Sequence, residues 1–175
     1  MENIVKDTTG LIHLVSSVIA LVTGLYVLVA QKGTKSHRQI GYIYALAMLL
    51  VNLTAFMIYR LYGKFGIFHV FAIISSITLF AGLYPVITKK SKDYLIKHFR
   101  SMYWSVIGLY CAFMAEIFSR LPKYILTPEG KPMLVFYKFV GIGTALVMII
   151  GTFFFLKFKP VWEKQYKETI KPKSI

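Results

Sequence analysis

The four histidines of this 175-residue chain are the residues whose chemistry is most informative. Each lies where a long apolar segment meets a charged one, at His13, His37, His69 and His98. Neutral imidazole nitrogens that face one another across a helix bundle are common ligands for a metal ion or for haem iron. Ionisable residues inside a membrane are also usually functional. The placement therefore predicts that pairs of these histidines hold a cofactor.

The segments that must position these histidines are apolar enough to cross a membrane. Hydrophobic residues make up 57% of the chain, whereas soluble domains have roughly 45 to 50%. Windows of about 20 residues predict an all-α membrane protein with five transmembrane helices. They form one transmembrane domain over residues 1–175, with helices at about 11–30, 37–60, 65–87, 98–119 and 134–156 and a basic tail at 157–175.

Two features narrow the class of protein further. The first apolar segment lacks a preceding basic cluster and a small-residue cleavage site, so it is predicted to be a membrane helix rather than a signal peptide. The single cysteine, Cys111, lies inside a predicted helix. The chain therefore has no internal disulfide, and without C-x-x-C-H it has no covalently attached c-type haem.

The distribution of basic residues predicts orientation. Of the 21 Lys and Arg residues, 14 fall on one side of the five predicted helices. The positive-inside rule places that side, with the C-terminal tail, in the cytoplasm of a bacterial inner membrane and the N-terminus outside. The net charge of +14 is thus assigned to topology and to attraction to anionic lipid headgroups, and not to nucleic acid.

The first four predicted helices also contain a repeat. The order His13, Gly24-Leu25-Tyr26, His37-Arg38 recurs as His69, Gly82-Leu83-Tyr84, His98-Phe99-Arg100. Two helices per repeat give both copies the same sense, so an axis along the membrane normal relates them. We therefore expect a pseudo-two-fold four-helix bundle that pairs His13 with His69 near the outer face and His37 with His98 near the inner face.

Helical periodicity predicts that the histidines face the interior of this bundle. At 100° per residue, each His shares one face of its helix with a set of residues at intervals of about one turn. These predicted faces are His13, Ser17, Ala20 and Gly24; His37, Gly41, Tyr44, Met48, Ala55 and Tyr59; His69, Ile73, Ser76 and Phe80; and His98, Ser105, Leu109, Ala112 and Glu116.

Two facing histidines suit haem better than other metal cofactors. Structural zinc needs four ligands and catalytic zinc three, and copper lacks its usual sulfur ligands here. Haem b needs only two axial nitrogens and an apolar pocket. Haem b, up to two per chain, is the predicted cofactor, with His13, His69, His37 and His98 as iron ligands. The alternatives are another metal or proton-relay role, or purely structural histidines.

The residues Lys32-Gly33-Thr34-Lys35-Ser36-His37-Arg38-Gln39-Ile40-Gly41-Tyr42 resemble the K-G-T-x-x-H-R-x-x-G-Y motif of an uncharacterised family of small bacterial inner-membrane proteins. The four-histidine arrangement is similar to the core of transmembrane dihaem cytochromes b that accept electrons from ascorbate. That second resemblance implies the ligand role for the four histidines alone. The chain departs from it because His37 and His98 lie in basic stretches at helix ends and a sixth helix is missing.

Three further residues are candidates for partner or proton roles. Arg38 and Arg100 follow the inner histidines, with Lys32, Lys35 and Lys97 nearby, and suit haem propionates; cytoplasmic anchoring is the alternative explanation of the same residues. Glu116 lies inside a predicted helix, where it suits proton uptake or an ion pair with Arg120. We therefore predict a b-type transmembrane electron carrier, and thus an oxidoreductase component, with a quinol or other electron donor. The alternative is a cofactor-free accessory or assembly subunit of a larger membrane complex.

Overall fold

The computed structural model describes residues 8–59, 63–119, 127 and 133–170 and is helical throughout the elements it contains. Its helices are α1 (Thr8–Val29), α2 (Lys35–Met57), α3 (Ile67–Thr88), α4 (Tyr94–Ser119) and α6 (Leu134–Ile170). All five are long and apolar enough to cross a membrane. The predicted all-α fold with five membrane-spanning helices is confirmed.

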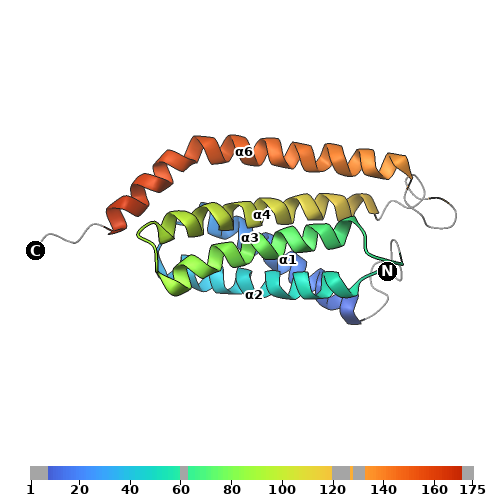
Figure 1. The fold of residues 1–175 in the computed structure, drawn as a ribbon, viewed down its shortest axis with the longest axis horizontal. Coiled ribbons are helices and arrows are strands. Elements are labelled where there is room, and N and C mark those ends of the chain that lie inside the picture. Colours follow the sequence, from blue (N-terminus) through green and yellow to red (C-terminus); the bar gives the residue numbers. More distant parts are fainter. Residues whose placement is uncertain (1–7, 60–62, 120–126, 128–132, 171–175) are drawn as a thin grey trace, which may run out of the picture.

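The first four helices pack as a bundle of two hairpins (Figure 1). α1 packs against α2, and α3 against α4, while α2 with α3 and α1 with α4 complete the ring. α1 and α3 therefore lie diagonally opposite each other and run in the same direction, as do α2 and α4. This is the arrangement that the sequence repeat predicts. We call the end where α2 and α4 begin the His37 end, and the opposite end the His13 end.

The bundle interior is filled by residues from the predicted faces. Ala20, Tyr44, Met48, Leu79 and Val106 are almost fully inaccessible and form one cluster. The predicted faces of α1, α2 and α4 are confirmed over these middle turns, since Gly24, Ser105 and Leu109 are also buried. The α3 face is wrong in part, because Ile73 and Phe80 are exposed. α3 has an almost uniformly apolar sequence, which gives periodicity little contrast.

The fifth helix differs from the prediction because it continues beyond residue 156. α6 packs against α4 and bends towards the bundle in its C-terminal part (Figure 1). Pro160 lies in this part, and an interior proline bends a helix because it lacks an N–H and crowds the preceding turn. The bend brings Trp162 and Tyr166 onto Phe99 of α4. Packing against these rings explains why residues predicted as a separate tail extend the helix.

Candidate functional site

His37 is held at the beginning of α2 by the loop that precedes it. Gly33 adopts a positive φ of 79°, which costs glycine little. The Thr34 hydroxyl then accepts a hydrogen bond from the His37 N–H at 3.2 Å, an N-cap that satisfies a free donor of the first turn. α2 therefore begins two residues before His37, so the ring projects from a formed helix.

His98 is oriented by the neighbouring helix. α4 begins at Tyr94, one turn before His98. The His98 Nδ1 lies 2.7 Å from the carbonyl oxygen of Gly82 on α3. A carbonyl only accepts, so Nδ1 carries the hydrogen and the neutral ring has its lone pair on Nε2. An Nδ1–H bonded to a backbone carbonyl is the usual support of a histidine that binds metal through Nε2.

A buried contact between α2 and α4 sets these two histidines at the same depth. The Tyr44 hydroxyl and the Ser105 Oγ lie 2.9 Å apart and both residues are fully buried. Tyr44 follows His37 by seven residues, and Ser105 follows His98 by seven. Seven residues are close to two turns, so each histidine lies about 10 Å from this contact on the same face of its helix. His98 is also among the titratable groups close enough to His37 to interact with it electrostatically.

Within the described residues, the His37 face of α2 carries an unpaired buried nitrogen and an open position one turn further on. His37 Nδ1 is buried and has no hydrogen-bond partner in the described part of the chain. Gly41 is one turn further on the same face, and a Cβ placed there would meet no heavy atom within 4 Å. The Nε2 lone pair of His98 fits an axial ligand of haem iron. On His37 the corresponding ligand would be Nε2, and Nδ1 would keep its hydrogen for an outer acceptor.

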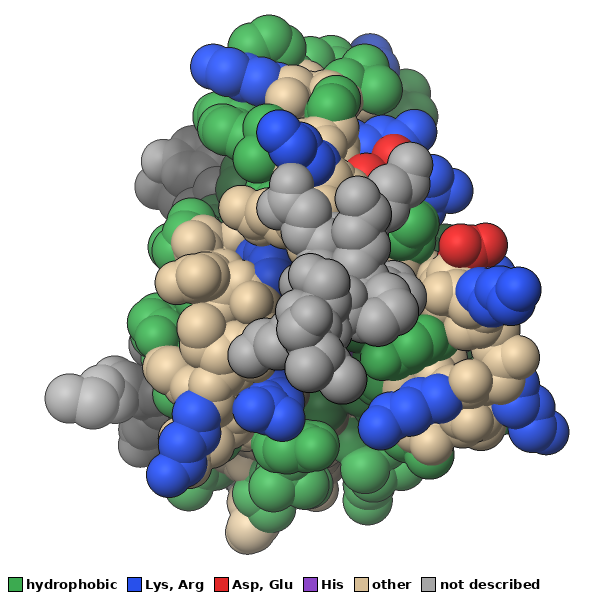
Figure 2. Space-filling model, turned by 90° about the vertical axis from the view of Figure 1, so that its left-hand side faces the viewer, with side chains coloured by type: hydrophobic (Ala, Val, Ile, Leu, Met, Phe, Trp, Pro, Cys, Tyr) green, Lys and Arg blue, Asp and Glu red, His purple; other side chains and the backbone are tan. Residues whose placement is uncertain are grey.

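Basic side chains surround this end of the bundle (Figure 2). Lys32 is partly buried here, and its Nζ donates to the carbonyl oxygens of Val27 and Leu28 at 2.5 and 2.7 Å. It lies 5.7 Å from the centre of the Trp162 ring. Burial lowers the pKa of Lys32 to about 8. Lys32 is therefore a cation near His37 that is well placed to neutralise an acidic group.

The two arginines predicted for this role are placed differently. Arg100 Nη2 donates to Glu163 Oε1 of α6 at 2.7 Å, and its side chain is half exposed. Arg38 is exposed. Arg100 therefore connects the bent end of α6 to α4, and Lys32, one of the nearby lysines named with the two arginines, is the better placed of the three.

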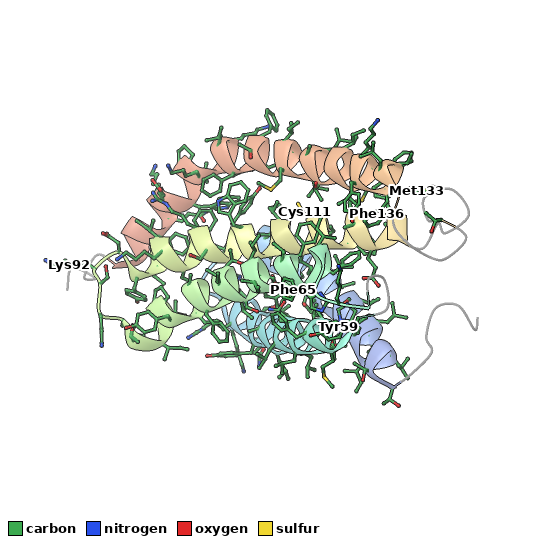
Figure 3. All side chains as sticks on the ribbon, turned by 45° about the vertical axis from the view of Figure 1, so that its right-hand side comes forward. Tyr59, Phe65, Lys92, Cys111, Met133 and Phe136 are labelled. Carbon is green, nitrogen blue, oxygen red and sulfur yellow. The ribbon has the colours of Figure 1, made fainter. Side chains whose placement is uncertain are left out.

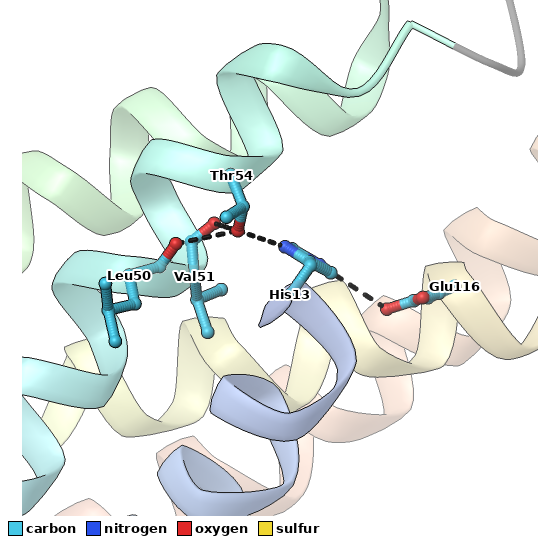
Figure 4. Close-up of polar contacts among 5 residues, drawn as sticks. All are labelled: His13, Leu50, Val51, Thr54 and Glu116. Carbon is cyan, nitrogen blue, oxygen red and sulfur yellow. Dashed lines mark hydrogen bonds and ion pairs between the residues drawn. The ribbon is translucent and has the colours of Figure 1, made fainter. Parts of the chain in front are cut away.

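His13 lies in a separate polar cluster at the opposite end (Figure 4). Its Nδ1 is 2.8 Å from Thr54 Oγ1. The Thr54 hydroxyl hydrogen is directed to the carbonyl oxygens of Leu50 and Val51, so the hydroxyl accepts from His13 Nδ1–H. His13 Nε2 then faces Glu116 Oε2 at 4.0 Å. Glu116 thus reaches the His13 end, as predicted, while Arg120, its other predicted partner, lies outside the described residues.

His69 has the opposite hydrogen-bonding arrangement. The N–H of Gly66 donates to His69 Nδ1 at 3.1 Å, so this nitrogen is an acceptor and the neutral ring carries its hydrogen on Nε2. The ring packs between Tyr59 and Phe65, with centroid distances of 4.6 and 4.9 Å. In this state His69 presents a donor, not a lone pair, through Nε2, which does not fit an axial ligand.

The structure therefore places His37 and His98 at the same end of the bundle, each two turns from the Tyr44–Ser105 contact, and gives His13 and His69 different partners. The pairing of His13 with His69 stays a prediction. Among the described residues, no group of three or more His, Cys, Asp and Glu side chains is placed to hold a metal ion.

Comparison with known proteins identifies the family. A family described as a predicted membrane protein, DUF2306, matches residues 10–150. The chain belongs to the DUF2306 family. The matched region begins within α1 and extends well into α6, so the family covers both histidine clusters. No match was found among curated proteins or among solved structures.

A search of the sequence for metal ligands does not find the residues that contact the histidines and Lys32. Thr54 has the sequence signal of a polar residue in a membrane helix, which predicts an interhelical hydrogen bond. The Gly82 carbonyl has only the repeated Gly-Leu-Tyr as a signal. Trp162 has no sequence signal of this kind, because its position near Lys32 depends on the bend of α6.

Proposed function

We propose that this DUF2306 protein is a b-type membrane electron carrier that holds a haem between His37 and His98. The observation that carries the proposal is the lone pair on His98 Nε2, fixed by the Nδ1–H bond to the Gly82 carbonyl, at the same depth as His37. Haem would supply one-electron redox chemistry when bound. The proposal is limited to one haem because the hydrogen bonds of His69 favour the wrong nitrogen at the other end.

The residues of the chain have distinct roles in this proposal. His37 and His98 would be the axial ligands, and the Gly82 carbonyl would hold the His98 ring in its orientation. Lys32 would neutralise a propionate, since it is a partly buried cation whose contacts in the described chain are two carbonyl oxygens and the Trp162 ring. Trp162 and its aromatic neighbours would cover Lys32 and exclude water from this end.

The charge distribution supports an orientation for the carrier. The His37 end and the C-terminal part of α6 carry most of the basic residues, so we place this end on the cytoplasmic side. Electrons would then be delivered to or taken from a cytoplasmic-side partner. A reporter fused after Ile175 of the bacterial protein is expected to be cytoplasmic, and one inserted near Glu129 periplasmic.

Haem content of purified variants tests the proposal. Protein produced with adequate haem supply is expected to contain about one b haem per chain by pyridine haemochrome, with a Soret band that shifts on dithionite reduction. His37→Ala and His98→Ala are expected to lose the haem, because each removes an axial ligand. His13→Ala is the matched control and is expected to keep it.

Three outcomes would contradict the proposal. A colourless wild-type protein that is folded would favour the cofactor-free accessory subunit. A ratio near two haems would restore the predicted second site at His13 and His69. Loss of haem in His13→Ala with retention in His37→Ala would assign the site to the wrong end of the bundle.

A further inference from the structure

Two buried donors at the His13 end lack acceptors. His69 is 2% exposed and Asn52 is 4% exposed. Within the described residues, neither His69 Nε2 nor Asn52 Nδ2 has a hydrogen-bond partner. A buried N–H without an acceptor costs about as much as a lost hydrogen bond, so two such groups on neighbouring helices need an explanation.

The donor character of His69 is fixed by its surroundings. Its Nδ1 accepts from the Gly66 N–H, which leaves the hydrogen on Nε2 of the neutral ring. Tyr59 and Phe65, which belong to the segment between α2 and α3, pack against the ring (Figure 3). The ring cannot turn without losing both the cap and these contacts, so Nε2–H remains directed away from the connection.

Asn52 is on the side of α2 that faces α3. Thr54 bonds to His13 on α1, and Asn52, two residues earlier, lies about 160° around the helix from it. Tyr44, which contacts Ser105 of α4, lies about 80° round α2 from Thr54, and Asn52 lies about 80° further in the same direction. Because α3 is the other helix packed against α2, the buried Asn52 faces α3.

His69 is on the side of α3 that faces α2. Gly82 on α3 lies against Met102 of α4, and His69, 13 residues earlier, lies about 140° around the helix from Gly82. His69 is also two residues from the beginning of α3, whereas Asn52 is five residues from the end of α2. With these helix ends level (Figure 1), the two donors differ in depth by roughly 5 Å.

We propose that His69 and Asn52 form a binding site for the carbonyl oxygens of a membrane quinone. Both groups donate and neither is charged, so the ligand must present neutral acceptor oxygens, and an anion would be costly at this depth. Leu53 and Val70 next to the donors are exposed on the apolar outer surface, so a lipid-soluble ligand would approach from this side. The proposal deepens the proposed electron carrier by naming its substrate class; buried water is the other source of a neutral acceptor oxygen.

Direct binding of a short-chain quinone distinguishes the two sources. Wild-type protein in lipid nanodiscs is titrated with ubiquinone-1 carrying ¹³C at its carbonyls, and the C=O stretch is followed by difference infrared spectroscopy. We expect saturable binding and a lowered carbonyl frequency. Asn52→Leu is expected to weaken binding about tenfold, the loss of one hydrogen bond, while Thr54→Val, on the opposite side of α2, is expected to bind like wild type.

The haem content of the same samples separates this proposal from the proposed function. A colourless protein that binds quinone through Asn52 would overturn the haem assignment and leave the quinone site. Saturable binding that is equal in wild type and Asn52→Leu, with both folded by circular dichroism, would overturn the quinone site. So would an absence of saturable binding in the wild type, which would assign the acceptor role to water.

Discussion

The Tyr44–Ser105 contact is the structural basis for placing His37 and His98 opposite each other, and it can be tested quantitatively. Both side chains are fully buried and their oxygens lie 2.9 Å apart. A buried hydrogen bond of this kind contributes about 1 kcal/mol net, and a partner left without its hydrogen bond costs about 1 to 3 kcal/mol. Tyr44→Phe and Ser105→Ala are therefore each expected to lower the free energy of unfolding by about 1 to 2 kcal/mol.

The double variant isolates the interaction itself. If the two groups bond to each other, Tyr44→Phe with Ser105→Ala is expected to cost less than the sum of the single changes, with a coupling energy of about 1 kcal/mol. The assay is SDS-induced unfolding in mixed micelles, followed by circular dichroism. Tyr84→Phe is the matched control, because Tyr84 is 59% exposed, and it is expected to change stability by less than about 0.5 kcal/mol. A coupling energy of zero would refute the α2–α4 register and with it the matched depth of His37 and His98.

Three further predictions concern the two ends of the bundle. Gly82→Ala is expected to destabilise the protein by about 1 kcal/mol or more, because an added Cβ would overlap a methionine of α4. Gly41 has open space around it, so Gly41→Ala is expected to be at least as stable as wild type. Thermal unfolding in detergent compares the two variants. Lys32 has a folded pKa of about 8 against about 10.4 when unfolded, so between these pH values the unfolded chain binds more protons than the folded one. The free energy of unfolding of the wild type is therefore expected to rise with pH across this window. Lys32→Met is expected to lack this rise when urea unfolding is repeated at several pH values. His13→Ala and Glu116→Gln are expected to be less than additive in stability, by about 0.5 to 1 kcal/mol, and strict additivity would show that the 4.0 Å approach carries no interaction.

The sequence predicted the helices and the central packing well because both depend on long apolar segments with one distinct face. Ala20, Tyr44 and Met48 on their predicted faces are fully buried. The prediction failed for Ile73 and Phe80, because in a membrane the outward face is apolar too. It also missed the extension of α6, since the stability of residues around Trp162 depends on rings of α4 that local sequence does not reveal.

Histidine chemistry was only partly readable from the sequence. Position along the chain predicted that His37 and His98 lie at one level, and the structure supports this through a contact two turns away. Which ring nitrogen carries the hydrogen depends on the hydrogen-bond partner, and the partners of His98 and His13 are the Gly82 carbonyl and the Thr54 hydroxyl. These partners come from other helices, so no spacing within one helix could predict them.

The repeat explains why the two ends of the bundle differ in chemistry even though their histidines occupy equivalent positions. His13 and His69 are equivalent by sequence, yet His13 donates through Nδ1 while His69 accepts there. Equivalent backbones therefore carry rings with opposite nitrogens available, and a symmetric pair of axial ligands would require His69 to give up its cap. The His37 end has no such conflict, because the Gly82 carbonyl leaves the lone pair of His98 on Nε2. Under the two proposals, one end would hold iron and the other would bind a neutral acceptor, which is the division of roles that a carrier between a lipid-soluble substrate and a partner at the His37 end requires.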